Sequence, residues 1–431
     1  MLIVRFQINS GGKKIIRMQT EYTDVLVIGA GPAGSIAAAM LQRAGIKVSV
    51  VEKEKFPRFV IGESLLPRCM EVLEAAGLLG VIKEKKFQKK FGAKFLKNDH
   101  VADYNFADQF TEGWTWTWQV PRSEFDMALI NEVSRRGVPV SFESTVTAIQ
   151  FFDDEHSVTT VQQKDGTFKN IEAKFIVDAS GYGRVIPRLF NLDRPSNLDP
   201  RKALFAHVKD DHRMDFDEPD RIIILVYAPG IWVWIIPFSN GITSLGFVGN
   251  LDFTSKDQSY LNEQFKTLIE GNPYLKARFS DQQWVFDARK LEAWSATTDK
   301  FFGKGYVLTG NATEFLDPIF SSGVMFATVS SELASRLTIR KLQGEAVDWD
   351  NDYTKVIQQG VDAFRSYVMA WYNETLDKIF FTKDQDPEIK KQICSVLAGY
   401  VWDQSNPYVR DHQTALEKLA MKINYRDKAL S

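Results

Sequence analysis

The pattern of hydrophobic and polar positions is clearest near the start of the chain. From Asp24, the stretch DVLVIGAGPAGSIAAAMLQRAGIKVSVVEK gives a β-branched run, a glycine turn, an alanine-rich segment and a second β-branched run that ends at Glu52. β-Branched residues favour strands and alanine favours helices. This order predicts one strand–helix–strand unit of a parallel sheet.

Later segments predict further helices and a second kind of sheet. Helical spacing is found in LLPRCMEVLEAAGLL, in SEFDMALINEVSRRG and beyond residue 345. Short alternating segments over residues 87–120, a meander that ends in VDASG, and the strand-rich residues 200–290 indicate sheet that differs from a parallel core. The sequence has no repeat and no low-complexity linker, so an interleaved α/β fold is expected.

Composition narrows the functions that are compatible with the chain. It has 431 residues, of which 44% are hydrophobic, enough for a large core. Its 53 basic and 55 acidic residues give no overall field that would attract nucleic acid or an anionic membrane, so a small-molecule partner is expected. The opening MLIVRFQINSGGKKIIRM lacks a cleavage site, and no stretch is apolar enough to span a bilayer.

Cys69 and Cys394 are the only cysteines, and both stand in helix-like contexts. Two are too few for a disulfide framework or a cysteine-based metal cluster, and no metal is expected. We interpret them as buried thiols of a reducing compartment, which predicts a cytoplasmic location.

The glycine turn GAGPAG fits a dinucleotide-binding signature. Gly29 permits the tight turn, Gly31 lets the backbone approach a pyrophosphate, and Gly34 lets the helix pack close to the strand. Glu52 stands where an acid accepts hydrogen bonds from the adenosine ribose. The signature does not choose between NAD and FAD, and a glycine turn of an ordinary α/β protein is the alternative. Only one such site is found, so reducing equivalents are expected from elsewhere.

Several short pieces between residues 23 and 380 carry a resemblance. They are GAGPAG at 29–34, PRFVIGESLLP at 57–67, KKFGAKF at 89–95, VPRSEFD at 120–126, VDASG at 177–181, WVWIIP at 232–237 and FLDPIFSSG at 315–323. Together they are similar to the FAD-dependent halogenases, in particular the phenol- and pyrrole-halogenating branch. The larger superfamily also holds aromatic monooxygenases and geranylgeranyl reductases.

The resemblance implies FAD as the cofactor and assigns residues to it. Arg122 is expected to contact the FAD phosphates or the ribityl chain, and Asp178 to begin a turn that covers the cofactor, unless either serves the fold alone. Asn311 replaces the family's aspartate near the ribityl chain with an amide that still accepts and also donates. The expected cofactor-binding residues are Gly29, Gly31, Ala33, Gly34, Glu52, Arg122, Asp178, Gly310, Asn311, Pro318 and Gly323.

The motif W-x-W-x-I-P is complete in this chain, at Trp232, Trp234, Ile236 and Pro237. In the family it is thought to keep the flavin from acting as an ordinary monooxygenase, which implies a position beside the flavin. A buried aromatic strand is the alternative, because Trp and Ile at alternate positions also fit a sheet that faces a core.

The pattern F-x-x-P-x-x-S-x-G, from Phe315 to Gly323, stands before a helix-like run. Backbone N–H groups at a helix start form a partly positive site for an anion. By the resemblance, the amides of Ser322 and Gly323 hold halide beside the isoalloxazine and Pro318 lines the ring's edge. The alternative is a plain helix N-cap made by Ser321 or Ser322.

Lys90 matches the family lysine that lies at the far end of a tunnel from the flavin and directs the oxidant to the substrate. Burial would lower its pKa and exclude water. Lys89 and other lysines crowd this stretch, and a solvated face is the alternative. Phe320 stands where tryptophan halogenases carry a glutamate, which counts against free tryptophan as substrate.

The resemblance and the pattern together divide the chain. The expected parts are an N-terminal extension (1–22), a discontinuous Rossmann-like FAD-binding domain (23–190 and 280–345) with an inserted sheet segment around 87–120, a mixed or antiparallel substrate-domain sheet (191–280) and a C-terminal helical region (346–431).

The implied function is halogenation of an electron-rich aromatic, free or bound to a carrier protein. Reduced FAD from a separate flavin reductase would react with O2 to a flavin hydroperoxide, chloride or bromide would attack it, and Lys90 would deliver the oxidant. The alternatives are an FAD-dependent monooxygenase, a geranylgeranyl-type reductase and a flavin-binding protein without chemistry.

Overall fold

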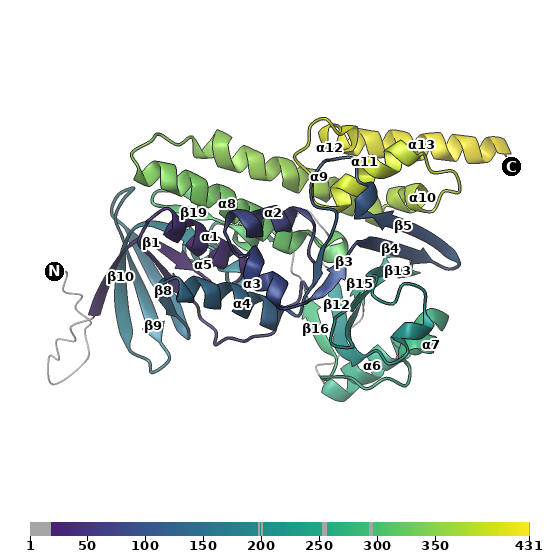
Figure 1. The fold of residues 1–431 in the computed structure, drawn as a ribbon, viewed down its shortest axis with the longest axis horizontal. Helices are drawn as coiled ribbons and strands as arrows, with labels where there is room; N and C mark the ends of the chain where they lie inside the picture. The colour runs from purple at the N-terminus through teal and green to yellow at the C-terminus, as the bar shows by residue number, and fades with distance from the viewer. Residues whose placement is uncertain (1–18, 197–198, 200, 252–256, 293–295, 431) are drawn as a thin grey trace.

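The computed structural model describes residues 19–196, 199, 201–251, 257–292 and 296–430, and it has the predicted α/β architecture (Figure 1). The first sheet has the order β18–β19–β10–β1–β2–β7, parallel from β19 to β7, with the hairpin β8–β9 attached to β10. Its strands are β1 (Gln19–Ile28), β2 (Val48–Val51), β7 (Val140–Ser141), β8 (Ser144–Phe151), β9 (Ser157–Gln163), β10 (Phe168–Asp178), β18 (Phe302–Gly303) and β19 (Tyr306–Leu308).

The second sheet has the order β16–β12–β15–β14–β13–β4–β5 and is antiparallel except between β13 and β4. Its strands are β4 (Gly92–Lys97), β5 (His100–Asn105), β12 (Lys202–Lys209), β13 (Ile223–Ala228), β14 (Ile231–Pro237), β15 (Ile242–Gly249) and β16 (Arg289–Glu292), and two short pairs are β3 (Gln88–Lys90) with β6 (Thr117–Gln119) and β11 (Asp193–Pro195) with β17 (Ala296–Thr298). The segment 87–120 thus supplies β4 and β5 to the second sheet.

The helices cover the sheets and form one end of the molecule (Figure 1). Helices α6 and α7 lie on one face of the second sheet, and α9 to α13 lie together at the C-terminal end. They are α1 (Pro32–Arg43), α2 (Arg68–Ala75), α3 (Leu79–Glu84), α4 (Arg122–Arg135), α5 (Val185–Leu189), α6 (Gln258–Glu270), α7 (Pro273–Phe279), α8 (Ser322–Leu342), α9 (Lys355–Tyr372), α10 (Thr375–Phe380), α11 (Pro387–Leu397), α12 (Pro407–Arg410) and α13 (His412–Leu430), with 3₁₀ turns η1 (Phe106–Asp108), η2 (Gly181–Gly183), η3 (Arg213–Asp215), η4 (Gly310–Ala312) and η5 (Pro318–Phe320) and a π-helical turn η6 (Asp350–Thr354).

Helix α1 shows why the glycine turn leads into a helix. Gly31 is its N-cap in extended conformation, and Pro32 occupies the first turn, where its missing N–H is not needed. The helix is buried from Pro32 to Leu41, because it packs against α8 as well as against the first sheet. This close packing brings the start of α8 near the glycine turn.

Two expectations need correction. Residues 19–22 were expected in an extension, but they already belong to β1 and pair with residues 169–172 of β10; residues 1–18 lie outside the described part. Residues 200–290 were expected to be strand-rich; they supply β12 to β15, but they also include α6 and α7, which were not expected. Both cysteines are buried free thiols, as predicted.

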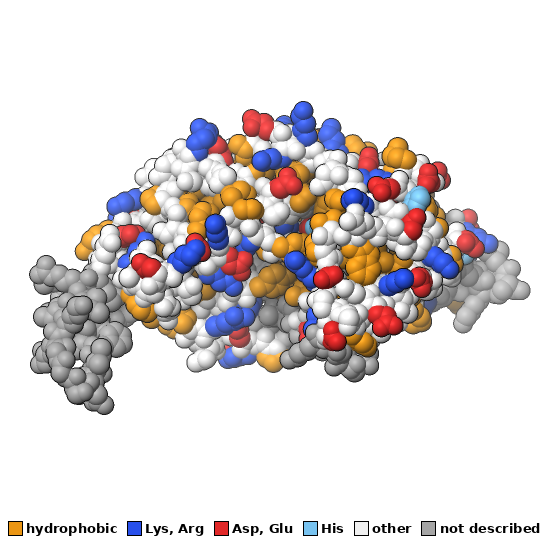
Figure 2. Space-filling view, turned by 90° about the horizontal axis from the view of Figure 1, so that it is seen from below, with side chains coloured by type: hydrophobic (Ala, Val, Ile, Leu, Met, Phe, Trp, Pro, Cys, Tyr) orange, Lys and Arg blue, Asp and Glu red, His pale blue; other side chains and the backbone are white. Residues whose placement is uncertain are grey.

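The surface reflects the nearly balanced charge of the sequence. Figure 2 shows one face of the molecule, on which basic and acidic side chains are interspersed with hydrophobic ones. Among the described residues, no helix combines the length and the apolarity needed to cross a bilayer.

Candidate active site

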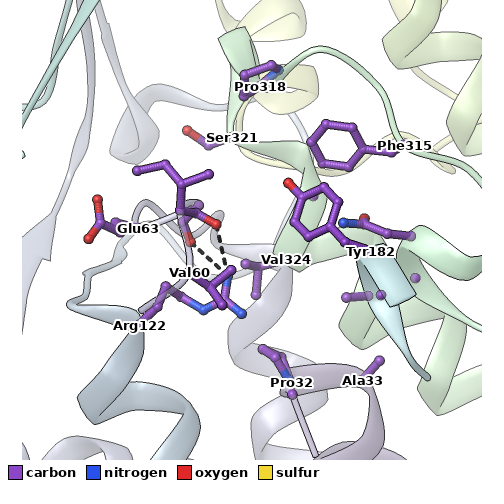
Figure 3. Close-up of a pocket in the computed structure, with 18 of the residues that line it drawn as sticks. Pro32, Ala33, Val60, Glu63, Arg122, Tyr182, Phe315, Pro318, Ser321 and Val324 are labelled. Carbon is purple, nitrogen blue, oxygen red and sulfur yellow. Dashed lines mark hydrogen bonds between the residues drawn. The ribbon is translucent and has the colours of Figure 1, made fainter. Parts of the chain in front are cut away.

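A cavity of about 220 Å³ lies beside the carboxyl ends of β1 and β2 and extends to the start of α8. Figure 3 shows Pro32 and Ala33 of α1 at one end of the view. Pro318 and Ser321, which precede α8, lie at the other end. Residues of the glycine turn, of the second sheet and of the F-x-x-P-x-x-S-x-G pattern all line this cavity.

The glycine turn forms one wall, where Gly29, Gly31 and Ala33 line the cavity. A Cβ on Gly31 would meet only the Arg58 guanidinium, at 3.4 Å, so the backbone at this position is open to a ligand. A Cβ on Gly34 would lie 1.9 Å from the Gly29 carbonyl oxygen. Gly34 is therefore needed for the packing of α1 rather than for lining the cavity, as its predicted role implies.

Glu52 closes this end of the cavity at the tip of β2. It is 6% exposed; its Oε2 accepts a hydrogen bond of 2.8 Å from the Ala30 amide, and its Oε1 accepts one of 2.9 Å from the Glu54 amide. The carboxylate is thereby fixed at the cavity wall, in a position that fits the recognition of ribose hydroxyls.

Asp178 holds the turn that follows it by hydrogen bonds to backbone amides. Its two carboxylate oxygens accept hydrogen bonds from the amides of Ser180, at 2.9 Å, and Ile186, at 2.7 Å. Burial raises the pKa of Asp178. Residues 179–183, the turn held by these bonds, line the cavity, whereas the Asp178 side chain lies behind them.

Arg122 lines the cavity, but its guanidinium already has protein partners. It donates to both carboxylate oxygens of Asp126, at 2.8 and 2.9 Å. It also donates to the carbonyl oxygens of Ile61 and Gly62, at 3.4 and 3.2 Å, and these two bonds are the dashed lines in Figure 3. It thus holds the segment around Gly62 over the cavity. A direct contact with FAD remains a prediction.

The remaining predicted cofactor residues, Gly310, Asn311, Pro318 and Gly323, all line the cavity, and Gly310 lies beside Ala33 of the glycine turn. Gly310 adopts a φ of 57°, which favours glycine, and its amide donates to the Ser330 hydroxyl at 2.8 Å. This part of the cavity wall is therefore attached to the body of α8.

Strand β14 presents Trp232, Trp234 and Ile236 to the cavity, whereas Pro237 lies beyond it and its carbonyl accepts a hydrogen bond of 2.5 Å from Gln119. The residues between them pack in the core under α6 and α7. Because side chains alternate along a strand, the motif faces the cavity with its aromatic residues.

The start of α8 offers an unusual helix N-terminus. Ser321 is the N-cap residue in left-handed conformation, with φ 59° and ψ 27°, and its side chain makes no capping hydrogen bond. The serine N-cap offered as the alternative is therefore not formed by Ser321. Ser321 and Gly323 line the cavity and Ser322 is buried beside them, so the first amides of a 21-residue helix meet the cavity edge.

Lys90 is buried, with 3% of its surface exposed. Its Nζ donates to the Ser64 hydroxyl at 2.8 Å and to the Leu65 carbonyl oxygen at 2.9 Å, and it lies 5.5 Å from the centre of the Phe106 ring. Burial lowers the pKa of Lys90 to about 7, because the charged amine loses its hydration. The solvated-face alternative is wrong for Lys90, and holds for the exposed Lys89.

A second, small cavity of about 20 Å³ adjoins Lys90, and we call it the lysine chamber. Such a volume holds about one water molecule. Apart from Lys90, the chamber is lined by Leu66, Ala93, Phe95, Phe106, Ile222, Ile224, Ile319, Phe320, Ser321 and Leu397. An aromatic ring is much larger than this volume, so it can enter only after some of these side chains move.

The lysine chamber and the large cavity share three wall residues. Ile222, Ile224 and Ser321 line both. These shared side chains separate the two cavities, so Lys90 lies one layer of residues away from the large cavity, next to the residue that precedes α8. The structure brings together Lys90, the α8 start and the β14 motif, which are far apart in the sequence.

Sequence reasoning missed two residues of the GES step within PRFVIGESLLP. Ser64 holds Lys90, and Glu63 lines the cavity with its Oε1 2.8 Å from His207 Nε2. Glu63 Oε2 is buried and has no hydrogen-bond partner in the part of the chain that the structure describes. This oxygen is therefore an acceptor for a hydrogen-bond donor on a bound ligand. The sequence motif contains both residues, but it predicted no role for either side chain.

Comparisons with known proteins fit this geometry. Residues 22–324 match the model of a family described as "FAD binding domain". The chain is 29% identical over 420 residues to a 1H-pyrrole-2-carbonyl-[peptidyl-carrier protein] chlorinase of Pseudomonas fluorescens, covering 90% of this chain and 91% of that protein. It is 30% identical over 409 residues to a flavin-dependent halogenase of Pestalotiopsis fici, covering 88% and 76%. A crystal structure titled flavoprotein/dehydrogenase, from Cytophaga hutchinsonii, superposes with a TM-score of 0.91 at 50% identity, covering 94% and 100%.

The chain is therefore an FAD-binding protein of this family. Within it, the chain belongs to the flavin-dependent halogenases. The predicted FAD cofactor is thereby confirmed, and the monooxygenase and geranylgeranyl-type reductase alternatives are not favoured. The site itself fits FAD, since an open glycine backbone, a fixed acid and an unpartnered carboxylate oxygen line one continuous cavity.

Proposed function

We propose that this protein halogenates an electron-rich aromatic compound of the pyrrole or phenol kind, with Lys90 as the residue that passes the halogen on. The observation that carries the proposal is the burial of Lys90 in a chamber that adjoins the flavin cavity. A buried amine whose pKa is lowered to about 7 is neutral in a large share of molecules at neutral pH.

The cofactor would be held along the large cavity. Glu52 would accept hydrogen bonds from the ribose, the backbone at Gly31 would approach the pyrophosphate, and Pro318 would line the flavin ring. Reduced FAD, when bound, would supply the two electrons that bring O2 to the peroxide level. This O2-derived oxidant would then take two electrons from halide, giving hypohalous acid while the second oxygen atom ends as water. The β14 motif would keep bulk water from the ring, because its large apolar side chains line the cavity.

The halide would lie at the start of α8. The amides of Ser322 and Gly323 belong to the first turn of the helix, which leaves them without intrahelical partners and places the positive end of the helix dipole there. Ser321, which precedes them, also lines the lysine chamber. An oxidant formed at this point would therefore lie beside Ser321, a residue that both cavities share.

Lys90 would hold the oxidant by hydrogen bonds or as a chloramine. Its bonds to Ser64 and Leu65 fix the nitrogen, and the aromatic walls exclude the water that would consume the oxidant. The apolar ring of Phe320 stands in the chamber wall, which supports a substrate whose ring is itself activated rather than one recognised by a carboxylate.

The substrate would be bound to a carrier protein, and reduced FAD would come from a separate flavin reductase. The first point rests on the relative from Pseudomonas fluorescens, whose name specifies a carrier-bound pyrrole. The second rests on the single dinucleotide signature of the sequence. Free aromatics remain the other option to test.

The test supplies reduced FAD, O2 and bromide together with a panel of phenols and pyrroles, each free and as the carrier-protein thioester. Mass spectrometry of the products should show the isotope pattern of bromine for at least one member, and a preference for the thioester would support the carrier. A product that is hydroxylated alike with and without bromide would contradict the proposal.

A further inference from the structure

The turn before α8, residues 314–321, is attached to helix α9 by polar contacts near both of its ends. The Glu314 carboxylate pairs with the Arg365 guanidinium, and Asp317 Oδ2 accepts a hydrogen bond of 2.9 Å from the Tyr372 hydroxyl. Arg365 and Tyr372 are seven residues apart, which is about two helical turns, so they lie on one face of α9.

Aromatic packing joins the same turn to the same helix. The Phe320 ring lies 6.4 Å from Phe364, 6.3 Å from Tyr367 and 6.3 Å from Trp371, measured between ring centres. These three residues belong to α9. The turn that carries Pro318 and Ser321 to the flavin cavity is therefore docked on the C-terminal helical region.

A chain of hydrogen bonds continues from the turn to the second sheet. The Tyr372 hydroxyl, which donates to Asp317, also accepts a hydrogen bond of 3.0 Å from Trp232 Nε1. Trp232 is the first residue of the β14 motif that lines the cavity. The Arg201 guanidinium lies 4.0 Å from the centre of the Tyr372 ring and places a positive charge beside this chain.

Asp317 is the member of the chain that fixes the backbone. It is 3% exposed and is the N-cap residue of η5, since its Oδ1 accepts a hydrogen bond of 3.1 Å from the Ile319 amide. Two residues later Ser321 adopts the left-handed conformation, which is uncommon for a residue with a Cβ. The surrounding contacts must hold such a conformation in place.

We propose that Asp317, held by Tyr372 of α9 and through it by Trp232, is a positioning residue that keeps the turn before α8 in the conformation that receives halide. This inference rests on the proposed function. It assigns helix α9, through Tyr372, a part in positioning the site. It also gives Trp232 a role through its N–H group in addition to its ring.

A purely structural cap would not need a carboxylate. Asparagine caps an N-terminal turn as well as aspartate does, without a buried charge. Burial raises the pKa of Asp317 to about 6, which means that the folded protein is less stable when this carboxylate is ionised. An aspartate at this position is explained if its second carboxylate oxygen, Oδ2, is needed to accept the hydrogen bond from the Tyr372 hydroxyl.

The test compares two tyrosine variants that each remove one tyrosine–carboxylate hydrogen bond of 2.9 Å. Tyr372→Phe removes the bond to Asp317, and Tyr400→Phe removes the bond to Glu71, away from the turn. Both are prepared with FAD bound, and chloride and bromide are titrated while the flavin absorbance is recorded. Trp232→Phe, which removes the other bond of the chain, is the second test variant.

We expect Tyr372→Phe to weaken halide binding by about five- to tenfold, as the loss of one typical buried hydrogen bond implies, with FAD affinity within about twofold of the wild type. Trp232→Phe should shift halide binding in the same direction, and Tyr400→Phe should not shift it.

Two failures are distinguishable. A wild-type protein whose flavin does not respond to halide at all would overturn the proposed function and this inference with it. A wild type that responds, next to a Tyr372→Phe variant with the same halide affinity or a Tyr400→Phe variant that is weakened equally, would overturn the positioning role alone.

Discussion

Lys89 and Lys90 occupy consecutive positions of the three-residue strand β3, yet their side chains meet opposite environments. Lys89 is exposed and lies 4.7 Å from the Trp116 ring centre, whereas Lys90 points into the lysine chamber. The alternation of a strand accounts for this difference. The sequence alone showed only a run of lysines, and the choice of Lys90 depended on the register of the family motif.

The lowered pKa of Lys90 predicts how stability changes with pH. The unfolded chain keeps this proton up to the ordinary value of 10.5, whereas the folded protein releases it near pH 7. Between these values the unfolded state binds more protons, so the free energy of unfolding rises with pH, by on the order of a few kcal/mol.

The measurement is urea unfolding of wild type, Lys90→Met and Lys89→Met at about pH 7 and about pH 9.5. Relative to Lys90→Met, the wild type should gain stability at the higher pH, and Lys89→Met should behave as the wild type does. Parallel behaviour of all three proteins would mean that Lys90 keeps an ordinary pKa.

Ser64 should matter to the delivery step and little to flavin binding. Its hydroxyl accepts one of the two hydrogen bonds that fix the Lys90 nitrogen. Ser64→Ala should lower the halogenation rate at saturating halide by about three- to tenfold, because one hydrogen bond contributes about 1 kcal/mol. FAD affinity, measured by fluorescence titration, should be unchanged. A rate equal to that of the wild type would leave Ser64 without this role.

At the scale of elements, the proposed halide site at the start of α8 makes a demand that competes with helix stability. Gly323 has no Cβ to limit the approach of an ion, but glycine near a helix start is a weak helix former. A Cβ at this position would lie 3.5 Å from the Phe315 ring, an ordinary contact, so the fold accepts alanine.

Gly323→Ala should therefore raise the melting temperature slightly, because alanine favours the helix by up to about 1 kcal/mol. The same change should raise the KM for halide several-fold, because the methyl group stands at the cavity edge. Thermal unfolding and halide-dependent kinetics on one preparation check both. Unchanged halide KM in a stabilised variant would remove the halide from this helix terminus.

The elements themselves were predictable where the pattern was strong. The first strand–helix–strand unit, α4 and strands β13 to β15 are present as predicted. Helices α6 and α7 were missed although Leu261, Phe265 and Ile269 recur at four-residue spacing and are buried. Strand-like runs stand on either side of this helical pattern and dominate the periodicity of the region.

At the scale of the whole molecule, the site is assembled from three separated parts. Lys90 comes from β3, Ser321 from the turn before α8, and Leu397 of the chamber wall from α11. The link between Asp317 and Tyr372 spans 55 residues. No pattern along a sequence reveals such a pair, since it depends on how α9 packs.

The whole chain has one dinucleotide signature, which predicts how electrons reach it. NADPH alone should not reduce the bound FAD at a useful rate, and adding an unrelated flavin reductase should start turnover. Stopped-flow absorbance of the flavin distinguishes these cases. Rapid reduction by NADPH without a reductase would instead place a nicotinamide site on this chain.

The central claim, that Lys90 passes the halogen to the substrate, is tested most directly by comparing wild type with Lys90→Met in one assay. Both receive reduced FAD, O2, bromide and the best aromatic acceptor, and both flavin oxidation and product mass are followed. The account predicts that flavin oxidation continues in Lys90→Met while the brominated product disappears. A Lys90→Met protein that forms the brominated product at the wild-type rate would contradict it.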